Sequence, residues 1–163
     1  MSHRRKILAP TLIALAFGLW GSALAFGASV TLQPAADTSL FENDPDSNLG
    51  ASDLAAGTIR TGFKSRALIR FDLTGKVPNN ATITSVELTL RVVREPPSVV
   101  PSTFGLHRLM QNWSEGAKSG LRGGPAAAGE TTWTARSFPS TSWSAPGASS
   151  PGDYVANSSS SKT

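Results

Sequence analysis

The stretch "SRALIRFDLTG", residues 65–75, alternates as a half-buried β-strand does, although it carries two arginines and an aspartate. One side of such a strand would carry Arg66, Leu68, Arg70 and Asp72. The other side would carry Ala67, Ile69, Phe71 and Leu73. We expect the second, wholly apolar side to face a core. The charges on the first side then either bind a ligand or pair with charges on neighbouring strands.

A second strand is predicted over residues 83–93, "ITSVELTLRVV", which alternates more regularly than any other segment. Its apolar side would carry Val86, Leu88, Leu90 and Val92, and its polar side Glu87, Thr89 and Arg91. If the two strands are neighbours, Glu87 and Arg91 are the expected partners of Arg70 and Asp72.

The fold class follows from short extended runs between turns rich in Gly, Pro, Asn and Asp, with no sustained helical apolar period. This pattern predicts an all-β fold, an antiparallel β-sandwich of jelly-roll type. The last residues, 151–163, are polar, and the pattern leaves nothing with which they would pair. We interpret them as a polar tail or as the start of a missing remainder, so the sandwich is expected to lack its C-terminal strand or strands.

Residues 1–25 read as a signal peptide: a basic start, an apolar run and a small-residue site that favours cleavage after Ala25. An uncleaved N-terminal anchor is the alternative. Cleavage would remove three of the fifteen Lys and Arg residues and no acid, which leaves twelve bases against eleven acids. We therefore expect a secreted, extracellular, monomeric domain with no membrane contact and no nucleic-acid partner. The chain contains no cysteine, so it uses no disulfide.

Three tryptophans follow the leader, at Trp113, Trp133 and Trp143. An aromatic ring can stack on the C–H face of a sugar, and it can equally pack in a core with its indole N–H satisfied. Both interpretations stay open from the sequence. The arginines of the predicted strand faces, Arg66, Arg70 and Arg91, are the candidate partners for sugar carboxylates.

The loop "NDPDSNLG" places Asp44, Asp46 and Asn48 at alternate positions, as the oxygen ligands of a calcium loop are placed. The EF-hand pattern fails, because Leu49 occupies the glycine position and Ala55 the position of the bidentate Glu. A turn closed by its own Asx side chains is the preferred interpretation. We expect no cofactor, with a structural calcium ion as the alternative.

Catalytic residues are sparse. Glu115 and Glu130 could pair as acid and base in glycoside hydrolysis, and His107, Arg108 and Tyr154 could act in a polysaccharide lyase. His107 is the one histidine after the leader, and no nucleophile motif accompanies it. We expect no active site in this segment, so the chain is not predicted to be an enzyme.

A set of ordered segments resembles the DNRLRE-domain family, which includes the disaggregatase-related repeat and alginate-binding modules. These segments are "ADTSLFENDPDSNLGASDLAAG", "SRALIRFDL", "VPNNATITSVELTLRV", "NWSEG", "TTWTARSF" and "WSAPGA". The resemblance covers about residues 29–150 and implies a jelly-roll module that binds carbohydrate. Family domains continue past the last of these segments, and the hexapeptide that names the family is absent here.

Three functions are compatible with these observations. The first is a secreted, non-catalytic module that binds an extracellular or cell-wall polysaccharide, such as the acidic alginate. The second is a structural or adhesive domain without a small ligand. The third is the N-terminal fragment of a polysaccharide-degrading enzyme whose catalytic domain lies beyond residue 163.

Overall fold

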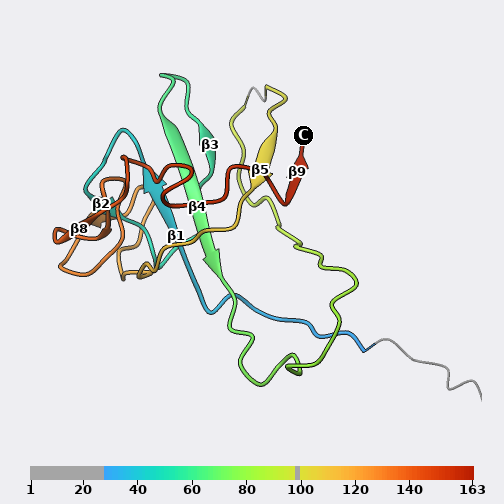
Figure 1. Cartoon of the computed structure of the whole chain (residues 1–163). Coiled ribbons are helices and arrows are strands. Elements are labelled where there is room, and N and C mark those ends of the chain that lie inside the picture. The colour runs from blue at the N-terminus through green and yellow to red at the C-terminus, as the bar shows by residue number, and fades with distance from the viewer. Residues whose placement is uncertain (1–27, 98–99) are drawn as a thin grey trace, which may run out of the picture.

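The computed structural model describes residues 28–97 and 100–163, and this part of the chain contains strands and no helix (Figure 1). The predicted all-β class is therefore confirmed. No helix in the described residues is long and apolar enough to cross a membrane. The predicted signal peptide, residues 1–25, lies outside the described residues.

The described strands are short and form several small antiparallel sheets. The largest sheet has the order β1-β4-β3, and the others pair β2 with β6, β5 with β9, and β7 with β8. The bounds are β1 Ala36–Phe41, β2 Ser47–Asn48, β3 Gly57–Thr58, β4 Lys64–Arg70, β5 Phe104–Leu106, β6 Gly124–Pro125, β7 Ala135–Ser137, β8 Thr141–Ser142 and β9 Ser160–Lys162.

The stretch 65–75 supplies most of β4, the central strand of the largest sheet, as its alternation predicts. β4 pairs along its length with β1, from Ala36 opposite Arg70 to Phe41 opposite Ser65. β3 and β4 form a hairpin, because the amide of Ile59 donates to the carbonyl of Phe63 at 2.9 Å.

The core lies on the side of β4 opposite to the one predicted. Leu68 packs against a cluster of buried residues from β1 and from the C-terminal half of the chain: Ala36, Leu40, Trp113, Trp133, Trp143 and Ala148. Arg66 and Arg70 share this side with Leu68. The opposite side carries Ala67 and Ile69, which are half-buried, and beyond the strand Leu73 is 51% exposed.

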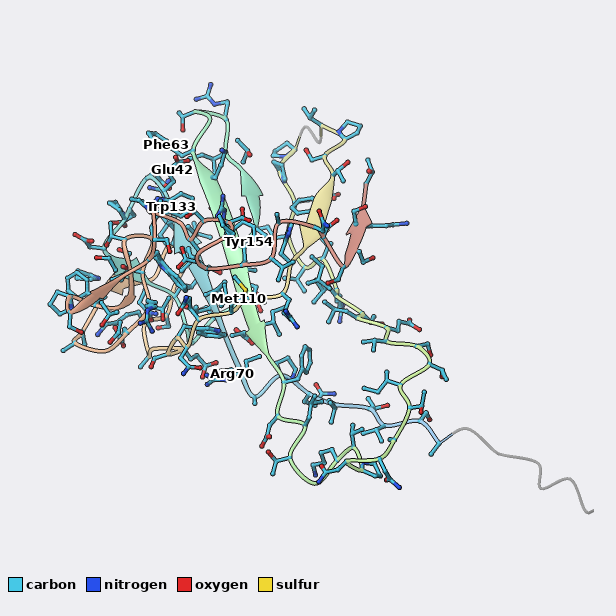
Figure 2. The ribbon with its side chains drawn as sticks, in the orientation of Figure 1. Glu42, Phe63, Arg70, Met110, Trp133 and Tyr154 are labelled. Carbon is cyan, nitrogen blue, oxygen red and sulfur yellow. The ribbon has the colours of Figure 1, made fainter. Side chains whose placement is uncertain are left out.

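The two arginines, Arg66 half-buried and Arg70 exposed, can share the core side of the strand because their guanidinium groups lie against aromatic rings. Arg66 lies 5.5 Å from the ring centre of Trp133 and 5.9 Å from that of Tyr154. Arg70, near the carboxyl end of β4 (Figure 2), lies 5.1 Å from the ring centre of Trp113. Counting apolar residues on each face of the strand leaves out these arginine–aromatic contacts. The count therefore predicts the wrong face of β4 as the core face.

The C-terminal residues do find partners, contrary to the expectation that nothing is left to pair. β9 pairs antiparallel with β5, with Gly105 opposite Ser161. Tyr154 forms a β-bridge with Leu109, and its ring meets that of His107 edge to face at 5.1 Å. Figure 1 shows β5 and β9 on one side of β4, and β2 and β8 on the other.

The predicted strand at residues 83–93 is absent from the structure. These residues run as an open trace from the loop after β4 toward β5 (Figure 1), without a ladder to any other described segment. Its apolar side chains are exposed, with Val86 at 85% and Val92 at 75%. A strand needs a neighbour for its backbone groups, and no described segment pairs with these residues. The predicted pairing of Glu87 and Arg91 with the charges of β4 is therefore wrong.

Candidate functional site

The arginines predicted to bind sugar acids do not gather in one place. Arg66 donates hydrogen bonds of 2.6 and 2.7 Å to the carbonyls of Gly147 and Ala148. Arg70 donates to the carbonyl of Trp113 at 3.1 Å. Both guanidinium groups therefore hold loops of the C-terminal half against the sheet. Arg91 lies on the unpaired segment and is exposed.

The three tryptophans are buried, with Trp113 at 8%, Trp133 at 6% and Trp143 at 4% exposure. The indole N–H of Trp143 donates to the carbonyl of Thr132 at 2.9 Å, as a buried indole requires. Of the two interpretations that the sequence left open, core packing is the one that this arrangement supports. Their rings offer little surface on which a sugar could stack.

Asp44, Asp46 and Asn48 have separate roles in the structure. The amide of Ser47 donates to the carbonyl of Asp44 at 3.1 Å, and Asp46 accepts the hydroxyl of Thr134 at 2.8 Å. Asn48 is fully buried and points away from this loop into a network of its own. The Asn48 side chain is therefore committed to this network and is not available to share a calcium ion with Asp44 and Asp46. The described residues contain no group of three or more acidic, His or Cys side chains that could hold a metal.

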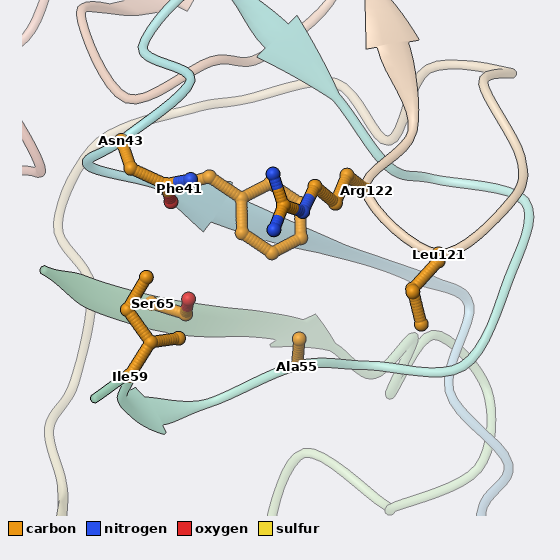
Figure 3. Close-up of a pocket in the computed structure, with 7 residues that line it drawn as sticks. All are labelled: Phe41, Asn43, Ala55, Ile59, Ser65, Leu121 and Arg122. Carbon is orange, nitrogen blue, oxygen red and sulfur yellow. The ribbon is translucent and has the colours of Figure 1, made fainter. Parts of the chain in front are cut away.

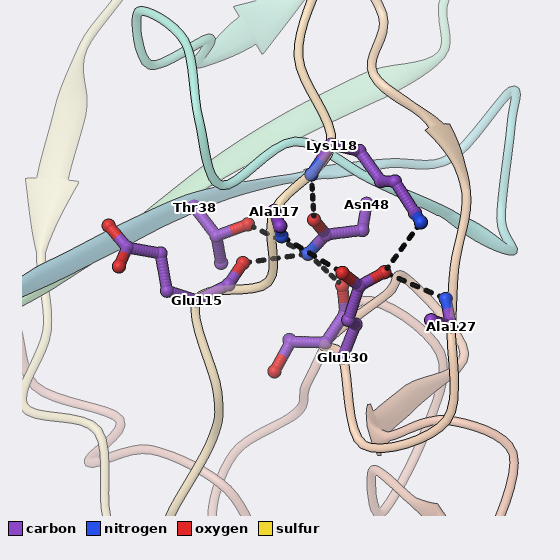
Figure 4. A network of polar contacts seen from close by, with 8 residues as sticks. Thr38, Asn48, Glu115, Ala117, Lys118, Ala127 and Glu130 are labelled. Carbon is purple, nitrogen blue, oxygen red and sulfur yellow. Dashed lines mark hydrogen bonds and ion pairs between the residues drawn. The ribbon is translucent and has the colours of Figure 1, made fainter.

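The Asn48 network joins four segments that are far apart in the sequence (Figure 4). Its amide nitrogen lies within hydrogen-bond distance of the carbonyls of Glu115 (2.8 Å) and Thr131 (2.9 Å), and of the Thr38 hydroxyl (3.3 Å). Its amide oxygen accepts the backbone N–H of Lys118 at 3.3 Å. A buried side chain with so many partners positions loops and is not free to bind a ligand.

The two glutamates considered as an acid–base pair also hold backbone. Glu130 accepts the amides of Ala117 at 2.9 Å and Ala127 at 2.7 Å, and Lys118 lies 3.9 Å from it (Figure 4). Glu115 accepts the amide of Asp37 at 3.0 Å. Burial, and then the charge of Glu115, raise the pKa of Asp37 above its ordinary value. Glu115 therefore holds the start of β1, and Glu130 holds the loop between residues 117 and 127.

His107 and Tyr154 do meet, in the edge-to-face contact described above. The Nδ1 atom of His107 lies 3.0 Å from the carbonyl of Val155, so the ring is tied to the C-terminal segment. This contact joins the end of β5 to the residues that lead into β9. The pair thus has a structural role that the sequence does not suggest, because the residues around Tyr154 have the composition of a polar tail.

A groove on the other side of the largest sheet is the best candidate for a binding site (Figure 3). It has a volume of about 200 Å³ and lies between the ends of β1 and β4 and the loop 117–123. Its apolar wall consists of Phe41, Ala55, Ile59 and Leu121. Its polar groups are Asn43, Ser65 and Arg122.

The elements that build the groove come together for local reasons. Phe41 ends β1 and lies directly opposite Ser65, so strand pairing places an aromatic ring beside a hydroxyl. Ile59 belongs to the β3–β4 hairpin, and Leu121 and Arg122 belong to a loop that is tied back by the hydrogen bond from the Ala51 amide to the Lys118 carbonyl, 2.9 Å. The groove therefore has a rigid side on the sheet and a less regular side on the loop.

The polar groups of the groove are available. Among the described residues, no hydrogen bond or ion pair engages the side chains of Asn43, Ser65 or Arg122. Arg122 is exposed, and Leu121 beside it is 71% exposed. A guanidinium that is not used by the fold can accept a carboxylate in a bidentate geometry. The groove thus combines an apolar wall with one cation, one amide and one hydroxyl.

Sequence reasoning missed all seven groove residues. A signal was present in "GLRGG", residues 120–124, where a leucine and an arginine lie in a glycine-rich loop outside any predicted strand. Binding residues are found disproportionately on loops, so such a pair is a candidate for ligand contact. The contribution of Phe41 could not be found in this way, because a strand-end aromatic residue is usually core.

Comparison with protein-family models, with curated proteins and with solved structures gives no match to this chain. The resemblance to the DNRLRE-domain family therefore stays a prediction. What can be said of function comes from the all-β fold and from the groove.

Proposed function

We propose that this chain is a secreted, non-catalytic carbohydrate-binding module whose groove at Phe41 and Arg122 binds one unit of an acidic polysaccharide. The single observation that carries the proposal is the groove itself, in which three polar side chains without a partner among the described residues stand beside an apolar wall. The strands would belong to an antiparallel sandwich of jelly-roll type, of which β1, β4 and β3 form part of one sheet.

Sugar is the ligand class that this combination fits. A pyranose ring presents C–H groups on its faces and hydroxyl groups at its edge. Phe41, Ile59 and Leu121 would contact the C–H groups, while Asn43 and Ser65 exchange hydrogen bonds with the hydroxyls. The volume of about 200 Å³ is below the about 300–1,000 Å³ of pockets for drug-sized ligands, which suits one unit of a longer chain.

Arg122 favours an acidic sugar over a neutral one. None of the described residues that line the groove is acidic, so a carboxylate bound there would meet the cation without a competitor among them. Uronates, the units of alginate and pectin, carry such a carboxylate on the ring. The proposed binding site therefore excludes Arg66, Arg70 and the three tryptophans, which we assign to the scaffold. Arg91 also lies outside the groove.

Retention on immobilised polysaccharides tests the proposal. We expect the exported chain to be retained on alginate and pectin, to be released by added salt because the contact is ionic, and to pass through a neutral glucan matrix. Absence of retention on every glycan of a broad array would contradict the proposal. It would favour a structural or adhesive domain, the second function compatible with the sequence.

Export is a separate part of the proposal and has its own test. We expect mature protein recovered from the periplasm or medium to begin at Phe26, after removal of residues 1–25. N-terminal sequencing decides this. Recovery of the intact leader in the membrane fraction would indicate the uncleaved anchor instead.

A further inference from the structure

The segment 83–95 is the most apolar exposed part of the described chain, and the groove does not use it. Its alternating residues Val86, Leu90 and Val92 are 85%, 64% and 75% exposed. Its backbone makes no hydrogen bond to another described segment. An alternating, β-branched segment with free backbone groups is a template for pairing with another strand.

We propose that this segment pairs antiparallel with the same segment of a second copy of the chain, about a two-fold axis at Thr89. In that register Thr89 lies opposite itself, Leu88 opposite Leu90 of the other copy, and Val86 opposite Val92. Apolar residues therefore meet apolar residues along the strand. An interface of this kind uses the same surface on both copies.

Charge complementarity selects this register. On the polar face, Glu87 of each copy lies opposite Arg91 of the other, so two opposite-charge pairs form by symmetry. A register centred on Glu87 places Glu87 opposite itself. A register centred on Arg91 places Arg91 opposite itself and Glu87 opposite Glu95. Like charges that face each other directly are destabilising.

The charges and the apolar positions thus agree on one arrangement, which is why we name a second copy and not another protein as the partner. The proposal replaces the expectation of a monomer. A strand pair of this length buries less surface than the about 1,200 Å² of a standard interface, so we expect a weak, concentration-dependent dimer. Prolines at 96 and 97 end the segment, because they cannot continue a ladder.

Sedimentation velocity of the full chain over a concentration series tests the proposal through charge reversal. The variant Glu87→Arg places arginine opposite Arg91, and Arg91→Glu places glutamate opposite Glu87. We expect each single variant to raise the dimer dissociation constant about tenfold, and the double variant Glu87→Arg/Arg91→Glu to restore it. An equal mixture of the two single variants should also dimerise, because every cross-copy pair is then of opposite charge.

The mixing experiment excludes a simple loss of folding, since misfolded variants would not rescue each other. Crosslinking gives a second readout, because the chain has no cysteine of its own. Under oxidising conditions Thr89→Cys should form a disulfide-linked dimer faster than Thr84→Cys, whose opposite residue is Arg94. The proposal is overturned if the wild type stays monomeric throughout the series, if the mixture does not associate, or if the two cysteine variants crosslink at equal rates.

Discussion

The guanidinium group of Arg66 lies 5.5 Å from the ring centre of Trp133 while it donates to the carbonyl of Gly147, the residue whose amide donates to the carbonyl of Trp133 at 2.6 Å. The arginine and the tryptophan are thus joined through one loop as well as directly. An arginine that the sequence offers as a ligand-binding group instead fastens the C-terminal half of the chain to β4.

Replacing Arg66 by Met should therefore destabilise the fold. Met keeps much of the apolar stem but leaves the carbonyls of Gly147 and Ala148 without their charged donor. We expect the free energy of unfolding to fall by about 1.5–3 kcal/mol, as for other hydrogen bonds to charged groups. Urea denaturation measures it, with the exposed Arg108→Met as control, for which a change within about 0.5 kcal/mol is expected. Equal midpoints for the two variants would contradict this role.

The Asn48 network predicts a larger loss. Asn48→Ala removes the donor that satisfies the buried carbonyl of Thr131 and the part-buried carbonyl of Glu115, so we expect a loss of about 2–4 kcal/mol. Thermal unfolding of the wild type should have the same midpoint with calcium and with a chelator, since Asn48 faces this network and not an ion. A midpoint that rises with calcium, and no longer does so in Asn48→Ala, would mean that the loop 44–48 binds the metal.

Gly147 is required by the packing of Trp133. It has a φ of 82°, and a Cβ added there would lie 2.5 Å from Cζ2 of the Trp133 ring. Gly75 has a φ of 65° with nothing within 4 Å of the same position, so it is a matched control. We expect Gly75→Ala to cost about 1 kcal/mol and Gly147→Ala to cost about 1–3 kcal/mol more, measured by the unfolding midpoint. Equal costs would show that the Trp133 ring is not fixed in place.

The raised pKa of Asp37 predicts a dependence of stability on pH. The folded chain binds this proton more tightly than the unfolded chain does. Folding is therefore favoured in acid, and that contribution is lost as the pH rises from the ordinary value of 3.8 through the folded pKa. Asp37→Asn cannot lose the proton, so its stability relative to the wild type should increase across this window. A difference that stays constant with pH would contradict the shift.

The all-β class and the β3–β4 hairpin could be predicted from the sequence, because alternation and turn residues are local signals. The core side of β4 could not. Arg66 and Arg70 count as polar in any pattern of alternation, and only the positions of Trp133 and Trp113, more than 40 residues away, make their side of β4 the core side.

Residues 83–93 are predicted as a strand but do not form one. Apolar and polar residues alternate most regularly here, yet a strand forms only beside another strand, and the alternation does not identify that neighbour. The groove was missed for a related reason. Phe41, Ser65 and Arg122 are far apart in the sequence, and strand pairing with loop closure brings them to one hollow.

Titration of an alginate oligosaccharide into the wild type, Arg122→Gln and Arg108→Gln tests the central claim most directly. The two variants lose the same charge, but Arg108 does not line the groove. We expect Arg108→Gln to bind as the wild type does, and Arg122→Gln to bind about tenfold or more weakly, since a charged hydrogen bond is worth about 1.5–3 kcal/mol. Equal affinity of the three proteins, or binding by none of them, would contradict the assignment of the groove.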